Sequence, residues 1–155
     1  MRGVALCIAA CAVLLLAACG GGSSRLSADA YRSELAKVKQ KSDSAQAAVA
    51  QGLQAKTIAE LRQRLDAFAA ASDRIGDEVA KLKAPKDAES ANAELAQGER
   101  DTARATRAAS AAIAKLKTPQ AALAYLQHSL GNAKGAHELY DAVAKLKKLG
   151  YTSGS

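Results

Sequence analysis

Cys19 is the residue of this 155-residue chain whose type and position most directly suggest chemistry. It closes the motif Leu16-Ala17-Ala18-Cys19, at the end of an apolar run. A cysteine thiolate is a nucleophile and a metal ligand, so its sulfur can be acylated, oxidised to a disulfide or bound to a metal. Which of these applies depends on the segment that precedes the motif.

The segment before Cys19 has the features of a secretion signal. Arg2 supplies a positive charge, and residues 4–18 carry no charge and consist mostly of Ala, Leu, Val and Ile. A run of about 15 residues suffices for a signal peptide but falls short of the ~20 that span a bilayer. Cys7 and Cys11 would be removed with it, which argues against a disulfide framework. A buried apolar helix and an uncleaved anchor are the alternative interpretations.

The motif Leu16-Ala17-Ala18-Cys19 resembles the lipobox of bacterial lipoproteins. The resemblance covers residues 1–19 and implies that the thiol of Cys19 receives a diacylglyceryl group. It also implies cleavage between Ala18 and Cys19, export, and stable anchoring, because two acyl chains hold a protein where one holds it only marginally. Gly20 follows, where Asp tends to mark retention at the inner membrane of diderm bacteria. The expected location is therefore the outer face of the cell membrane, or the outer membrane in a diderm.

The expected domain organisation follows from this cleavage site. Residues 1–18 form the lipoprotein signal peptide, and residues 19–26 form the lipidated cysteine with a Gly/Ser tether. Residues 27–150 form a helical bundle domain, and residues 151–155 form a flexible tail. The mature chain has 137 residues (155 minus 18), enough for one domain with a modest core.

The composition favours slim helices over a thick globule. The chain has one Phe, four Tyr and no Trp, so its core must consist of Leu, Ile, Val and Ala. Its formal charge is +7, with both signs spread along the chain. Nucleic acid is not an expected partner, because the chain is expected to be exported and offers no platform of aromatic side chains for stacking bases.

Heptad stripes predict helices in the first half of the domain, over residues 27–50 and 58–82. Thr57 and Glu60 form a capping box before the second, and Pro85 follows it. Apolar spacings of three and four are typical of helices that pack at crossing angles of ~20°. The two stripes are Tyr31, Leu35, Val38, Ser42, Ala45 and Val49, then Ile58, Leu61, Leu65, Phe68, Ser72, Ile75, Val79 and Leu82.

Two further segments are predicted after Pro85. The first runs to about Lys117 on a stripe of small side chains that lets a neighbour approach closely. The second spans residues 119–149, with Thr118 as its N-cap. Gly131 and Gly135 each cost about 1 kcal/mol within a helix, so this segment forms one helix or two. The stripes are Ala88, Ala91, Leu95, Gly98, Thr102, Ala105, Ala109, Ile113 and Leu116, then Leu123, Leu126, Leu130, Ala133, His137 and Tyr140, continued by Leu139, Val143 and Leu146.

The expected fold class is all-α, an antiparallel up-down bundle of three to four long helices, because short connections make successive helices antiparallel. Such a bundle gathers basic residues at the end nearest the membrane. Anionic headgroups attract such residues, and complementation of helix dipoles is the alternative explanation. The residues concerned are Arg25, Lys81, Lys83, Lys86, Lys145, Lys147 and Lys148.

No catalytic or metal-binding constellation is recognisable. Neither His128 nor His137 has an acidic residue three positions earlier, as a di-iron bundle needs. No Gly-x-Ser-x-Gly motif, phosphate-binding loop or cysteine nucleophile is present. We therefore expect no enzyme activity, no cofactor and no metal. The acidic residues closest to basic neighbours are expected in surface ion pairs, and they are Asp77, Glu78, Glu99 and Asp101.

These features predict a lipid-anchored cell-envelope protein that acts as a non-enzymatic structural or interaction module. Its domain resembles small alanine-rich helical envelope lipoproteins. The expected partners are the membrane, through diacylglyceryl on Cys19, and another envelope protein. Tyr125, Tyr140 and Tyr151 are candidates for a tyrosine-lined patch that binds a partner or ligand, although core filling explains Tyr140 equally well and Tyr151 falls in the tail. The alternative is an envelope binding protein that holds a small or lipidic ligand in an apolar cavity between its helices.

Overall fold

The computed structural model describes residues 24–52, 54–131 and 133–152. The signal segment, the cleavage position at Ala18 and the candidate lipidation site Cys19 lie outside the described residues. The elements are helices α1 (Ala28–Gly52), α2 (Ile58–Lys81), α3 (Glu89–Ile113), α4 (Pro119–Gly131) and α5 (Lys134–Lys148), with a short 3₁₀ turn, η1 (Lys86–Ala88), before α3.

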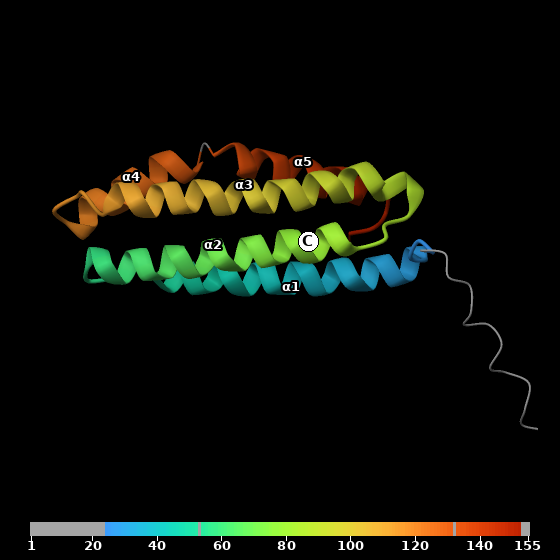
Figure 1. The fold of residues 1–155 in the computed structure, drawn as a ribbon, viewed down its shortest axis with the longest axis horizontal. Helices are drawn as coiled ribbons and strands as arrows, with labels where there is room; N and C mark the ends of the chain where they lie inside the picture. The colour runs from blue at the N-terminus through green and yellow to red at the C-terminus, as the bar shows by residue number, and fades with distance from the viewer. Residues whose placement is uncertain (1–23, 53, 132, 153–155) are drawn as a thin grey trace, which may run out of the picture.

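The helices form an antiparallel up-down bundle, as the sequence predicts (Figure 1). Helix α2 packs against α1 on one side and α3 on the other, and α5 packs against α3. Helices α4 and α5 follow one another along α3, so the fourth predicted segment is two helices. We call the end where α1 and α3 begin and α2 and α5 finish the proximal end, and the opposite end the distal end.

Side chains cap the helices close to the predicted positions. Thr57 Oγ1 accepts a hydrogen bond from the Glu60 amide at 3.1 Å. The Glu60 carboxylate accepts from the amide of Lys56 at 3.3 Å, so the capping box is displaced by one residue. Thr118 Oγ1 accepts from the Ala121 amide at 3.2 Å, which confirms Thr118 as the N-cap of α4.

The core consists of two apolar clusters, one towards each end. Helices α1, α2, α3 and α5 all contribute to the proximal cluster. Its larger members include Tyr31, Leu35, Val38, Ile75, Val79, Leu95 and Leu146. Only α2, α3 and α4 contribute the buried residues of the distal cluster, which are Leu61, Leu65, Ala109, Ile113, Ala122 and Leu126. Between the two clusters, α2 and α3 bury Ser72, Glu99 and Thr106. The middle of the core is therefore partly polar.

Helices α3 and α5 approach each other through glycines on both sides. A Cβ added to Gly98 would lie 3.0 Å from the Leu139 amide nitrogen. A Cβ added to Gly135 would lie 2.8 Å from the Asp101 carbonyl carbon and closer still to the Thr102 nitrogen. The prediction that small residues on α3 admit a close neighbour is confirmed. The same contact explains why a glycine is kept at the start of α5.

The break before α5 changes which of its residues face the core. The buried or half-buried positions on α5 are Gly135, Ala136, Glu138, Leu139, Ala142 and Leu146. The expectation that His137 and Tyr140 continue the stripe of α4 is wrong, because the stripe restarts in a new register after residue 133. Tyr140 is 77% exposed. Val143, also assigned to the core, is 44% exposed.

Tyr151 is part of the core, although the sequence places it at the start of a flexible tail. Its side chain is 7% exposed and packs edge-on against Tyr31, with ring centroids 5.1 Å apart. Its hydroxyl donates to Asp87 at 3.0 Å, and Arg32 lies 5.7 Å from its ring centroid. Tyr151 thus connects the segment after α5 with both α1 and η1.

Candidate functional surfaces

The segment that enters the bundle is fixed to the proximal end. Arg25 Nη1 donates to the Ala84 carbonyl at 2.9 Å, and Nη2 makes an ion pair with Glu89, also at 2.9 Å. The Leu26 amide donates to the Lys83 carbonyl at 2.7 Å. A tether attached at residue 24 therefore leads directly to the link between α2 and α3.

The seven basic residues that the sequence assigns to one end do lie on segments that meet at the proximal end. Two of them have a carboxylate partner. Arg25 pairs with Glu89, and Lys145 lies 2.5 Å from Glu94, where its ammonium holds the pKa of that carboxyl below the ordinary value. The other five form no ion pair with any described carboxylate: Lys81, Lys83, Lys86, Lys147 and Lys148.

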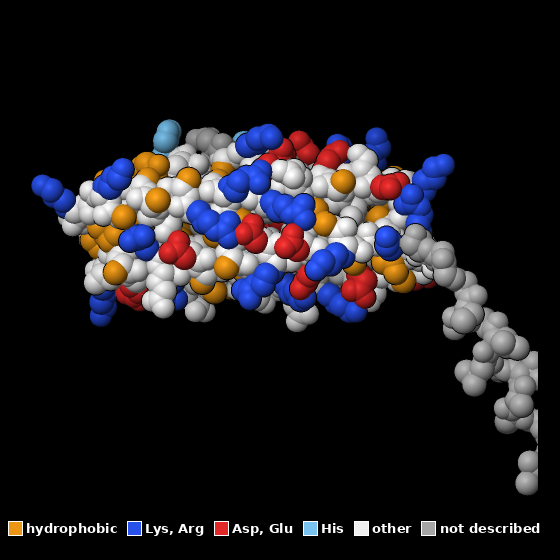
Figure 2. All heavy atoms as spheres, viewed as in Figure 1, with side chains coloured by type: hydrophobic (Ala, Val, Ile, Leu, Met, Phe, Trp, Pro, Cys, Tyr) orange, Lys and Arg blue, Asp and Glu red, His pale blue; other side chains and the backbone are white. Residues whose placement is uncertain are grey.

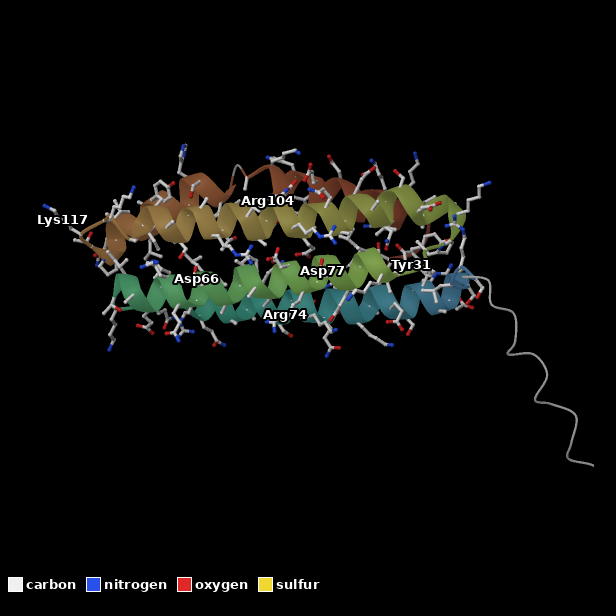
Figure 3. The ribbon with its side chains drawn as sticks, viewed as in Figure 1. Tyr31, Asp66, Arg74, Asp77, Arg104 and Lys117 are labelled. Carbon is white, nitrogen blue, oxygen red and sulfur yellow. The ribbon has the colours of Figure 1, made fainter. Side chains whose placement is uncertain are left out.

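Along the sides of the bundle, by contrast, charges of both signs intermingle and pair (Figure 2). Arg100 Nη2 lies 2.9 Å from Asp77, and this ion pair joins α3 to α2. Figure 3 labels Asp77 on α2. Lys41 lies 2.5 Å from Glu78. Asp101 pairs with Arg104 and, at 3.8 Å, with Lys134. Asp77, Glu78 and Asp101 are therefore in ion pairs, but only Asp101 pairs with a basic neighbour at helical spacing, as expected, whereas the partners of Asp77 and Glu78 stand on neighbouring helices.

Glu99 is the exception, because it is buried instead of lying on the surface. It is 4% exposed, on the face of α3 that packs against α2. Burial raises the pKa of its carboxyl to about 7, an effect that a hydrogen bond with Ser72 partly opposes. The sequence does carry a signal, since Asn92, Glu99 and Thr106 recur every seven residues. These three are the polar members of a second buried stripe, which α3 needs because it packs against α2 as well as α5.

Asn92 belongs to the same stripe, and its amide is satisfied inside the proximal cluster. The Tyr31 hydroxyl donates to Asn92 Oδ1 at 2.9 Å, and Asn92 Nδ2 donates to the Val79 carbonyl at 3.0 Å. Burial raises the pKa of Tyr31 to about 12, so this phenol stays protonated at ordinary pH. The network ties α1, α2 and α3 together and gives Asn92 a structural role.

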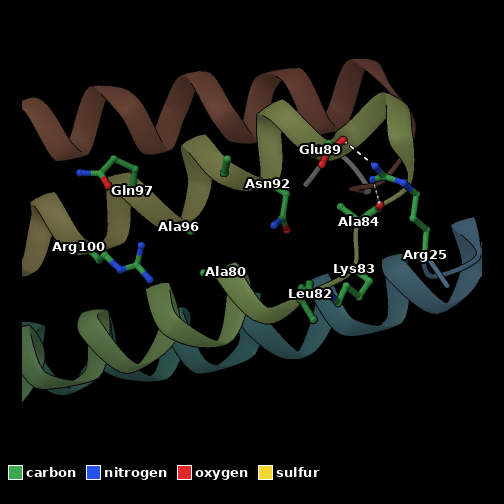
Figure 4. Close-up of a pocket in the computed structure, with 11 residues that line it drawn as sticks. Arg25, Ala80, Leu82, Lys83, Ala84, Glu89, Asn92, Ala96, Gln97 and Arg100 are labelled. Atoms are coloured by element: carbon green, nitrogen blue, oxygen red, sulfur yellow. Dashed lines mark hydrogen bonds and ion pairs between the residues drawn. The ribbon is translucent and has the colours of Figure 1, made fainter. Parts of the chain in front are cut away.

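A surface hollow of about 740 Å³ lies between the end of α2 and the start of α3 (Figure 4). Its lining combines alanines with charged side chains, including Arg25, Lys83 and Arg100. A second hollow of about 450 Å³, beside α3 and the α4–α5 break, is lined by Tyr125, Asp101 and several alanines. Both differ from the apolar cavity that the ligand-binding alternative predicts.

The described residues contain no group of three His, Cys, Asp or Glu side chains arranged to hold a metal ion. Both histidines are exposed, His128 on α4 and His137 on α5. In the same ranges, no helix combines the length and the apolar character that crossing a bilayer requires.

The fold and these surfaces define the class of the domain as an antiparallel all-α bundle with a basic proximal end. Comparisons with protein-family models, with curated proteins and with solved structures found no match for this chain.

Proposed function

We propose that this protein is a bacterial lipoprotein, exported and held at the cell envelope by a diacylglyceryl group on Cys19. The observation that carries the proposal is the motif Leu16-Ala17-Ala18-Cys19 at the end of an uncharged apolar segment with a basic start. Arg25 and Leu26 support it, since their bonds to the α2–α3 link bring the chain out of the bundle at one defined end. An anchor at Cys19 then tethers the bundle by that end.

We further propose that the anchored bundle is a non-enzymatic module that binds another envelope protein. Support comes from three large apolar side chains that are exposed on α4 and α5: Tyr125 by 42%, Tyr140 by 77% and Val143 by 44%. Tyrosine is enriched in protein interfaces because it buries a large rigid ring at low entropic cost. Tyr140 and Val143 lie three residues apart on one face of α5, as a helix-presented contact requires.

The alternative function is the binding of a small or lipidic ligand. The observation in its favour is the hollow of about 740 Å³ between α2 and α3, which is lined by alanines and charged side chains together and so departs from the purely apolar cavity expected from the sequence. An amphiphile fits such a lining better than a purely apolar ligand.

Substitution of the anchor residue tests the first part of the proposal. Wild-type protein, expressed in a bacterium fed an alkyne-tagged fatty acid, is expected to incorporate the tag. Cys19→Ala is expected to lose it entirely, because no other thiol stands at a cleavage site. Cys11→Ala is the matched control, since it removes a thiol within the apolar run and should leave labelling unchanged. Unlabelled wild-type protein, or a labelled Cys19→Ala variant, would refute acylation at Cys19.

Site-specific crosslinking tests the interaction face. A photoreactive residue at position 140 should yield a discrete crosslinked species in intact cells, abolished when Val143→Glu is added to disturb the same face. The same residue at position 66 is the control, because Asp66 is exposed on α2, away from α4 and α5. Equal crosslinking from positions 140 and 66 would exclude a specific partner on this face.

A further inference from the structure

We infer that the proximal end of the bundle binds an anionic lipid surface through five lysines, which we call the basic cap: Lys81, Lys83, Lys86, Lys147 and Lys148. The inference rests on the proposed anchor for its geometry. It specifies in addition that the lipid surface is anionic and that the proximal end of the bundle faces it.

The first argument is that the charges of the cap are not neutralised locally. All five lysines are exposed, and none pairs with a described carboxylate. The acidic side chains at this end have other partners. Glu89 binds Arg25, Glu94 binds Lys145 and Asp29 binds Arg32, so Asp87, which accepts from the neutral Tyr151 hydroxyl, is the one carboxylate among these that keeps its charge beside the cap. The cap therefore presents cations that an external anion can reach.

The second argument concerns helix dipoles. A lysine in the last turn of a helix is favoured by the negative end of the dipole, which accounts for Lys81 on α2 and for Lys147 and Lys148 on α5. It does not account for Lys86, which stands in η1 immediately before α3, where the dipole disfavours a cation. Dipole complementation alone thus leaves this lysine unexplained, whereas a basic surface includes it.

The third argument is distance from the anchor. Five residues separate Cys19 from Arg25, and a chain of that length spans at most about 20 Å. The proximal end therefore stays close to the bilayer, whose surface potential decays over a Debye length of about 8–10 Å. The distal end lies farther by the length of α2, whose 24 residues extend about 36 Å.

The distal end supplies a matched control within the same molecule. Three lysines stand in the links at that end: Lys56 between α1 and α2, and Lys115 and Lys117 between α3 and α4. All three are exposed, and none forms an ion pair with a described carboxylate. The mature protein, purified from membranes, is reconstituted into vesicles of phosphatidylcholine alone or with one-third phosphatidylglycerol. A limiting amount of an acetylating ester then modifies the lysines, and mass spectrometry reports the rate at each position.

A negative surface raises lysine pKa values and so lowers the fraction of reactive free amine. We expect the cap lysines to react about threefold more slowly on the anionic vesicles than on the neutral ones. The distal lysines should react equally on both. In 1 M salt, where the Debye length shrinks to about 3 Å, the difference should disappear. For each lysine, the acetylation rate on neutral vesicles is divided by the rate on anionic vesicles. The same value at both ends of the bundle, or a raised value for the cap that persists in 1 M salt, would overturn the inference of a basic cap.

The intact mass of the reconstituted protein separates this inference from the proposed anchor. A protein without the diacylglyceryl group would refute the anchor whatever the labelling shows. A lipidated protein whose cap lysines ignore the vesicle charge would refute the cap and leave the anchor standing.

Discussion

Gly135→Ala is expected to lower the free energy of unfolding by about 2 kcal/mol, in the range measured for overpacked cores, and the melting temperature by roughly 8 °C. The added methyl group would lie 2.8 Å from the Asp101 carbonyl carbon and closer to the Thr102 amide nitrogen. Those atoms belong to the backbone of α3 and cannot rotate away, so α5 must move outward. Thermal unfolding followed by circular dichroism measures the change.

The direction of the change in stability distinguishes overpacking from helix propensity. Alanine is the better helix former, by about 1 kcal/mol, so helix propensity alone predicts that Gly135→Ala stabilises the protein. Ala144→Gly, at an exposed position of the same helix, is the control and should cost about 1 kcal/mol. A Gly135→Ala variant as stable as the wild type would mean that α3 and α5 do not meet through their glycines.

Glu99→Gln is expected to stabilise the protein by up to about 3 kcal/mol above neutral pH and by little near pH 4.5. Glu99 is buried, no cation among the described residues pairs with it, and its folded-state pKa is about 7 against an ordinary value of 4.5. Between these two values the folded state keeps a proton that the unfolded state has lost. Stability from this group is therefore fully present below pH 4.5, falls as pH rises, and is lost above pH 7.

Urea denaturation of wild type and Glu99→Gln from pH 4.5 to 8 measures this dependence as the difference between their unfolding free energies. The difference should grow with pH and level off above pH 7, because the amide cannot ionise. Gln63→Ala is the control, since it replaces an exposed, uncharged side chain on α2 and removes no titratable group. Its difference from the wild type should not vary with pH. A flat profile for Glu99→Gln would show that the Glu99 carboxyl reaches solvent.

Local signals allowed most of the fold to be predicted. The apolar stripe of α2 is buried or half-buried at every predicted position, because spacings of three and four constrain a helix to one face. Thr57 and Thr118 cap the predicted helices, since a side-chain oxygen at that position satisfies an unpaired amide. These signals lie within a few residues of the structure that they specify.

What the sequence did not reveal depends on contacts between distant segments. Glu99 is expected on the surface because carboxylates usually are, and the seven-residue spacing that it shares with Asn92 and Thr106 indicates burial only once α3 is known to lie between α2 and α5. Tyr151 was assigned to a tail because it follows Gly150, yet Tyr31, 120 residues earlier, packs against its ring. The core-facing positions of α5 also differ from the prediction. Gly131 and Gly135 indicate that a break is possible in this segment, but they do not indicate at which residue it occurs.

For the basic residues of the proximal end, likewise, the position could be predicted from the sequence and the ion pairs could not. The sequence predicts that seven basic residues gather at the proximal end, since an up-down topology alone brings these helix ends together, but it does not add Arg32, which lies against Gly150 and Tyr151 there. It did not show that Arg25 and Lys145 pair with carboxylates while five lysines do not, because Glu89 and Glu94 stand on α3 and their partners come from other segments.

The central claim is that lipid on Cys19 holds this bundle at the envelope, and the intact mass of the protein extracted from membranes tests it most directly. We predict the mass of residues 19–155 increased by a diacylglyceryl group, with fragmentation placing the increment on the first residue. A mass that includes residues 1–18, or a Cys19 whose sulfur still reacts with a thiol reagent, would contradict the claim.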